Sequence, residues 1–137
     1  MSKTYVLDAS ALVIFFQKDP GFEKISRLFK DAHAAGHSLL MSAVNWGETY
    51  AVILRLQGET AAEQAKTITT SLRIELASVT PDDAVAAAGI RVRHQLRYLD
   101  SFAAALALAN HATLVTADMD FQKVARRISI LWLRRHA

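Results

Sequence analysis

The stretch TYVLDASAL, residues 4–12, decides how this chain folds. Its aromatic and β-branched residues predict a strand over 4–8, and Ser10 can cap a helix that runs from there to about Lys18. A strand that leads directly into a helix begins a βα unit, and repeated units of this kind build parallel sheets. The carboxylate of Asp8 therefore stands at the carboxyl end of a strand, where open α/β sheets bind their ligands.

The rest of the chain continues this alternation of short strands and helices. Further strands are predicted at residues 38–42, 74–79, 113–116 and 128–133. Helices are predicted at residues 22–36, 43–56, from 60 onwards, 81–97, 100–109 and 120–126. With no repeat or linker, the sequence predicts one α/β domain over residues 1–137, whose central, mostly parallel sheet is flanked by helices on both faces.

Composition narrows the class of protein. An apolar fraction of 52% over 137 residues provides a core and excludes wholesale disorder. The absence of cysteine excludes a disulfide framework, a thiol nucleophile and a thiolate zinc site. No apolar stretch approaches the roughly 20 residues of a membrane span, and the N-terminus lacks the pattern of a signal peptide. We therefore expect a cytoplasmic protein that enters no membrane, and its net charge of +3 suits a polyanionic partner.

Five acidic residues form the candidate site. Each follows a short apolar run or lies near the start of a helix, and they are Asp8, Glu48, Asp100, Asp118 and Asp120. Because the carboxyl ends of parallel strands meet at one edge of a sheet, we expect the first four carboxylates to converge, with Asp120 close behind. Like charges at short range repel, and a divalent cation removes that repulsion. Oxygen ligands suit Mg²⁺ or Mn²⁺, so the acids predict a metal-dependent nuclease or phosphoryl-transfer site.

Several of these residues also have a purely structural interpretation. Ser10 and Thr116 are placed to hydrogen-bond the acids or a metal-bound water, but Ser10 could instead cap its helix and Thr116 could fill a strand. Asp100 taken alone could be a plain helix cap, and Asp120 can cap the short helix that follows it. Glu48 differs, because it lies in an unusually apolar helix where a surface acid is less expected.

The acids, in this order and with these surroundings, resemble the PIN domain of metal-dependent ribonucleases and, more narrowly, the VapC-type toxins of bacterial toxin–antitoxin pairs. The stretches that carry the resemblance are residues 6–12, 45–48, 99–107 and 112–121. Together they span almost the whole chain. Two positions depart from the family pattern: Ser101 stands where a small apolar residue is common, and Gly47 stands where alanine is usual. Neither departure removes a carboxylate.

The resemblance implies a Mg²⁺- or Mn²⁺-dependent endoribonuclease that acts as the toxin of a type II toxin–antitoxin pair. Asp8, Glu48, Asp100 and Asp118 would hold one or two ions. Asp8 and Asp100 would be direct ligands, while Glu48 and Asp118 would bind a second ion or orient the attacking water. The substrate would be RNA. The family further implies a cognate antitoxin, whose C-terminal segment covers the acidic groove, and a homodimer formed through helices.

Basic residues close to Asp100 in sequence are candidate contacts to RNA phosphates, namely Arg91, Arg93 and Arg97. The alternative for each of these arginines is a solvated helix face.

Two other classes of function remain open from the residues alone. A phosphohydrolase or phospho-receiver would use a nucleophilic aspartate with a second acid and a lysine. Here Ser10 stands where the second acid of an Asp-x-Asp pair would be, and the lysine available near the C-terminal acids is Lys123. The other class is a catalytically inactive PIN-like binding module, which would normally have lost some of the four acids.

Overall fold

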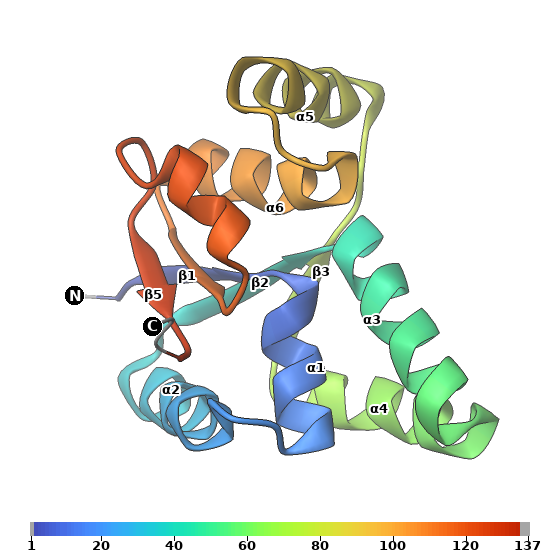
Figure 1. Cartoon of the computed structure of the whole chain (residues 1–137). Helices are drawn as coiled ribbons and strands as arrows, with labels where there is room; N and C mark the ends of the chain where they lie inside the picture. Colours follow the sequence, from blue (N-terminus) through green and yellow to red (C-terminus); the bar gives the residue numbers. More distant parts are fainter. Residues whose placement is uncertain (1, 135–137) are drawn as a thin grey trace.

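A five-stranded sheet forms the centre of the molecule in the computed structural model, which describes residues 2–134 (Figure 1). The strands are β1 (Thr4–Leu7), β2 (Ser38–Ser42), β3 (Ile74–Ala77), β4 (Thr113–Thr116) and β5 (Ile130–Trp132). Their order is β3-β2-β1-β4-β5, and every neighbouring pair is parallel. The predicted parallel sheet is therefore confirmed.

The strand order contains a switch point between β1 and β4. The chain first proceeds outwards from β1 to β2 and β3, and then returns to the other side of β1 to add β4 and β5. Connections that leave two neighbouring strands toward opposite edges of a sheet open a crevice at their carboxyl ends. The sheet therefore offers its ligand crevice at the ends of β1 and β4.

Helices cover both faces of the sheet. They are α1 (Ala9–Gln17), α2 (Phe22–Ala35), α3 (Ala43–Gln57), α4 (Glu59–Ser71), α5 (Pro81–His94), α6 (Tyr98–Ala109) and the 3₁₀ helix η1 (Met119–Val124). Successive strand residues point to opposite faces. Leu7 and Val115 pack with α1 and α2, whereas Val6 and Leu114 pack with α6 and η1. Figure 1 shows α2 and α6 on opposite sides of the sheet. All four side chains are fully buried, so the predicted two-sided packing is confirmed.

Helix α5 ends earlier than predicted. We expected a helix to about Arg97, but α5 ends at His94, because Gln95 has a left-handed backbone conformation with φ 58°. The Gln95 N–H closes the last helical turn. Helix α6 then begins with Arg97 as its N-cap residue, so Asp100 lies in the first turn of α6 and the interpretation of Asp100 as a plain cap is wrong.

The remaining boundaries differ by a few residues. The predicted strands at 74–79 and 128–133 extend past β3 and β5, because the neighbouring strands pair only with Ile74–Ala77 and Ile130–Trp132. The short helix predicted at 120–126 is η1, which has 3₁₀ geometry. Within residues 2–134, no helix combines the length and the apolar character needed to cross a membrane.

Candidate functional site

The candidate site lies at the carboxyl ends of β1 and β4. Asp8 follows β1 and is the N-cap residue of α1, and Asp118 follows β4 and is the N-cap residue of η1. Asp100 comes from the first turn of α6, and Glu48 comes from α3. Four elements that are far apart in sequence thus bring acids to the switch point of the sheet.

Asp8 is held by three hydrogen bonds and is almost fully buried, with 3% of its surface exposed. Its Oδ1 accepts from Ser10 Oγ at 2.7 Å and from the Ala11 N–H at 3.0 Å. Its Oδ2 accepts from Thr116 Oγ1 at 2.7 Å. Burial raises the pKa of Asp8 to about 7, although the hydrogen bonds from Thr116 and Ser10 lower it. The carboxyl group therefore has a fixed direction, and a nearby cation would favour its ionised form at neutral pH.

Ser10 and Thr116 connect the ends of the two strands. The Thr116 Oγ1 that donates to Asp8 also accepts from the Asp118 N–H at 2.9 Å. Ser10 Oγ donates to Asp8 and accepts from the Ala117 N–H at 3.1 Å. Both hydroxyls therefore hydrogen-bond an acid. The alternative that Ser10 caps α1 is wrong, because Asp8 is the N-cap residue and accepts from the first helical turn.

Asp100, Asp118 and Asp120 form a compact group of carboxylates. One oxygen of each lies within 4.8 Å of the others. Asp100 is buried, whereas Asp118 and Asp120 are partly exposed. The interpretation of Asp120 as a helix cap is wrong, because Asp118 is the cap of η1 and its Oδ1 accepts from the Asp120 N–H at 3.0 Å. The Asp120 carboxylate instead belongs to the acidic group, with Lys123 Nζ 3.8 Å away.

Glu48 lies beside this group and is partly buried. Burial raises the pKa of Glu48, and the negative charge of Asp100 raises it further, while Asn45 and Arg97 lower it. The charges of Asp100 and Asp118 thus act on Glu48, as expected for a member of the same site. A carboxylate with a raised pKa is also a better proton acceptor near neutral pH.

The three candidate arginines lie in different surroundings. Arg97 Nε donates to Asp100 Oδ2 at 2.9 Å, and Arg97 Nη2 donates to Asp118 Oδ2 at 2.7 Å. Arg91 and Arg93 are exposed on α5, and the Arg93 guanidinium lies back along its own helix beside Gly89. The structure therefore brings Arg97 into the acidic group and leaves the other two on a helix surface.

Asn45 is a site-forming residue to which the sequence analysis gave no role. It is buried, with 1% of its surface exposed, and its Nδ2 donates to the Leu99 carbonyl at 2.9 Å. This bond joins the first turn of α3 to the first turn of α6, one residue before Asp100. The sequence signal that could have identified Asn45 is a polar amide within an apolar helix. Such a side chain is buried with the helix and needs a hydrogen-bond partner.

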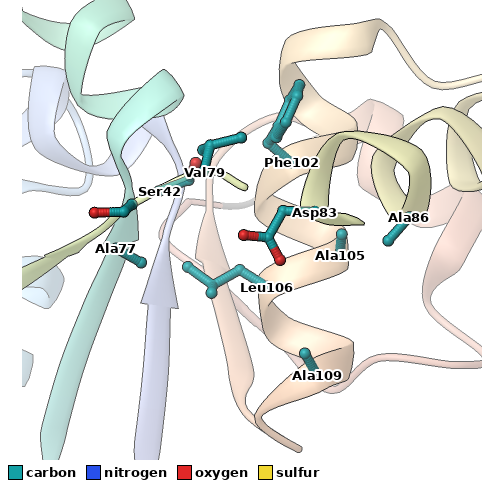
Figure 2. A pocket seen from close by; sticks show the side chains of 10 residues that line it. Ser42, Ala77, Val79, Asp83, Ala86, Phe102, Ala105, Leu106 and Ala109 are labelled. Atoms are coloured by element: carbon teal, nitrogen blue, oxygen red, sulfur yellow. The ribbon is translucent and has the colours of Figure 1, made fainter. Parts of the chain in front are cut away.

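A cavity of about 70 Å³ lies elsewhere, between the ends of β2 and β3 and the helices α5 and α6 (Figure 2). Small and apolar side chains dominate its wall, which consists of Ser42, Ala77, Ser78, Val79, Asp83, Ala86, Phe102, Ala105, Leu106 and Ala109. Asp83 points toward it from α5, but this carboxylate already accepts from the Thr80 N–H at 2.9 Å in the helix cap. None of the five candidate acids lines this cavity, so it is a packing gap separate from the site.

The ligand types at the switch point suit a hard divalent cation. The candidate donors are carboxylate oxygens, which Mg²⁺ and Mn²⁺ prefer, with the hydroxyls of Ser10 and Thr116 behind Asp8. Three of the acids already lie at mutual distances that one ion can span. Fold and site together define an α/β protein with a group of carboxylates at the switch point of a parallel sheet.

The sequence model of the PIN domain matches residues 5–127, so the chain belongs to the PIN domain family. This range includes all five acids of the candidate site. No curated protein matches this chain at a significant level.

Solved structures of VapBC and VapC proteins have a similar fold. A chain of VapBC2 from Rickettsia felis, bound to a promoter DNA fragment, has a TM-score of 0.76 at 17% identity over 93% of this chain and 97% of that chain. VapC20 from Mycobacterium tuberculosis, a toxin that cleaves the sarcin–ricin loop, has a TM-score of 0.72 at 22% identity over 90% and 95%. A chain of DNA-bound VapBC from Salmonella typhimurium has a TM-score of 0.70 at 17% identity over 98% and 100%.

Proposed function

We propose that this protein is a Mg²⁺- or Mn²⁺-dependent endoribonuclease and the toxin of a type II toxin–antitoxin pair, acting in the cytoplasm. The observation that carries the proposal is the convergence of acids from β1, α3, α6 and β4 on the switch point of a PIN domain. Such a concentration of carboxylates is unfavourable without a cation, and a partly buried carboxylate group suits a divalent ion more than any neutral ligand.

The ligands divide according to how they are held. Asp8 and Asp100 are the buried acids and would bind the ion directly, whereas Asp118 and Asp120 are partly exposed. When bound, the ion lowers the pKa of a water molecule and offsets negative charge on the scissile phosphate. Ser10 and Thr116 fix the direction of Asp8 through their hydroxyl groups. Their hydrogen bonds prevent this buried carboxyl from turning away from the crevice.

Glu48 would accept a proton from the attacking water. Its pKa is raised by burial and by the charge of Asp100, which brings its proton affinity closer to that of a base working at neutral pH. Asp118 would hold a second ion or orient the same water. The bond from Asn45 to the Leu99 carbonyl joins α3 to α6. Glu48 and Asp100 lie on these two helices and would approach the phosphate from both.

The partners follow from the same proposal. RNA is the substrate, and Arg91, Arg93 and Arg97 would contact its phosphates along the start of α6 and the end of α5. A cognate antitoxin would cover the acidic crevice and a second copy of the chain would form a dimer through helices. The similarity of this chain to chains of VapBC from Rickettsia felis and Salmonella typhimurium supports a protein partner of this kind.

A growth experiment tests the toxin function. Expression of the chain without an antitoxin should arrest bacterial growth, and Asp100→Asn should relieve the arrest because the amide cannot hold the cation. Asp82→Asn, which changes an exposed acid in the first turn of α5, is the matched control and should still arrest growth. Arrest by a folded Asp100→Asn protein would contradict the proposal.

A further inference from the structure

The guanidinium of Arg97 bridges two of the candidate metal ligands. Its Nε is 2.9 Å from Asp100 Oδ2, and its Nη2 is 2.7 Å from Asp118 Oδ2. We propose that Arg97 is an internal cation that competes with the divalent ion for Asp100 and Asp118, and so sets the metal affinity of the site. This inference rests on the proposed function, because it concerns the same metal site.

Competition follows from the atoms involved. The carboxylate oxygens of Asp100, Asp118 and Asp120 lie within 4.8 Å of one another, and Arg97 donates to two of these carboxylates. A divalent ion among them would lie a few Å from the guanidinium, and like charges at that distance repel. The ion and the guanidinium would also share the carboxylates of Asp100 and Asp118. Full engagement of one therefore weakens the other.

The position of Arg97 in the fold allows its side chain to leave without disturbing the core. The side chain is 65% exposed in its ion pairs with Asp100 and Asp118. The backbone is fixed independently, because the Arg97 carbonyl accepts from the Ser101 N–H and from Ser101 Oγ, both at 3.0 Å. Rotation about side-chain bonds is enough to release the carboxylates. The start of α6, which positions Asp100, stays in place.

The pKa shifts around Arg97 agree with its role as a counter-ion to the acids. The pKa of Arg97 is raised, first by its hydrogen bond to Asp100 and then by the charges of Asp100, Asp118 and Glu48. Burial raises the pKa of both Glu48 and Asp100, and the positive charge of Arg97 opposes that rise in each. The guanidinium thus offsets repulsion among the acids when no divalent ion is bound. Once displaced, the exposed guanidinium remains beside the acids, where the proposed phosphate contact needs a cation.

The test is calorimetric titration of Mn²⁺ into the metal-free protein. Arg97→Gln should bind Mn²⁺ more tightly than the wild type, on the order of tenfold, which is the size of a typical coupling between two ligands. Arg55→Gln is the charge-matched control, because Arg55 is an exposed residue in the last turn of α3, and it should bind like the wild type. Arg97→Gln should also lower the melting temperature of the metal-free protein, and Arg97→Lys should restore part of that loss.

The outcomes separate this inference from the proposed function. Suppose that the wild type binds Mn²⁺ but that the affinity of Arg97→Gln is no higher than that of Arg55→Gln. The proposed competition by Arg97 is then wrong, while the metal site stands. If neither the wild type nor the folded variants bind Mn²⁺ or Mg²⁺, the metal site itself is wrong and the inference fails with it. Circular dichroism of Arg97→Gln establishes that the variant is folded in either case.

Discussion

Thr116 Oγ1 donates a hydrogen bond to Asp8 Oδ2 at 2.7 Å, although the two residues are 108 positions apart in sequence. The same hydroxyl accepts from the Asp118 N–H at 2.9 Å. One side chain at the end of β4 therefore fixes the direction of one acid and the backbone of another. Two of the candidate ligands are coupled through this hydroxyl.

Thr116→Val should destabilise the metal-free protein by about 1–3 kcal/mol, because it leaves a buried carboxyl and a backbone N–H without this partner. Valine keeps the shape of threonine, so the packing of β4 should be preserved. Thr113→Val, at the other end of the same strand, is the control. Urea unfolding measures both variants, and equal stability of the two would show that the Thr116 hydroxyl has no special role.

The raised pKa of Asp8 predicts a specific pH dependence. In the unfolded chain this carboxyl ionises near 3.8, whereas in the folded protein it keeps its proton until about pH 7. The folded state therefore binds more protons between these values, and the contribution of Asp8 to the free energy of unfolding falls as pH rises from about 4 to 7. The loss should be on the order of 3–4 kcal/mol for a shift of this size.

Comparison with Asp8→Asn isolates this effect from the other acids. The stability difference between wild type and variant, measured by urea unfolding without metal, should shift in favour of the variant as pH rises over this range. A difference that is flat from pH 4 to 7 would contradict the raised pKa. Added Mn²⁺ should reduce the pH dependence in the wild type, because a bound cation favours the ionised carboxyl.

Asn45→Ala should weaken both the fold and metal binding. The Asn45 amide donates to the Leu99 carbonyl beside Asp100, so its loss should destabilise the protein by about 1–3 kcal/mol and loosen the first turn of α6. Asn110→Ala is a matched control, because it removes an exposed bond from the same amide group to the Leu106 carbonyl at the other end of α6. Calorimetry should show weaker Mn²⁺ binding for Asn45→Ala alone.

The proposed phosphate contacts of α5 can be tested without cleavage. In EDTA, the double variant Arg91→Gln and Arg93→Gln should bind single-stranded RNA more weakly than the wild type. The slope of the logarithm of the RNA-binding constant against the logarithm of salt concentration should become shallower by about 1.4, or roughly 0.7 for each lost contact. Arg55→Gln should keep the original slope. An unchanged slope in the double variant would assign these two arginines to a solvated helix surface.

The sequence predicted the sheet well because it depends on local patterns. Short apolar runs followed by Asp8 and Asp118 mark strand ends, and parallel strands bring such ends together. The end of α5 was misjudged because Gln95 has a left-handed conformation that is usually marked by glycine. Ser10 has a typical capping side chain, yet Asp8 is the N-cap residue because α1 begins at Ala9, one residue before Ser10.

The contacts that complete the site depend on tertiary structure and leave little trace in the sequence. The bond from Asn45 to Leu99 spans 54 positions, and the ion pair from Arg97 to Asp118 spans 21. Each requires two elements to be packed before the partner is defined. Arg97 was predicted to contact phosphate. Its spacing of three residues from Asp100 is a local signal for one ion pair, whereas the pair with Asp118 depends on tertiary packing.

RNA cleavage by the purified protein tests the central claim most directly. The wild type should cut single-stranded RNA in Mg²⁺ or Mn²⁺ and should stop when EDTA is added. Asp100→Asn should lower the rate on the order of 10²-fold or more while the protein stays folded, because the amide removes a charged ligand from the ion that stabilises the transition state. Equal cleavage in EDTA, or by the folded Asp100→Asn protein, would show that this acidic group is not the catalytic centre.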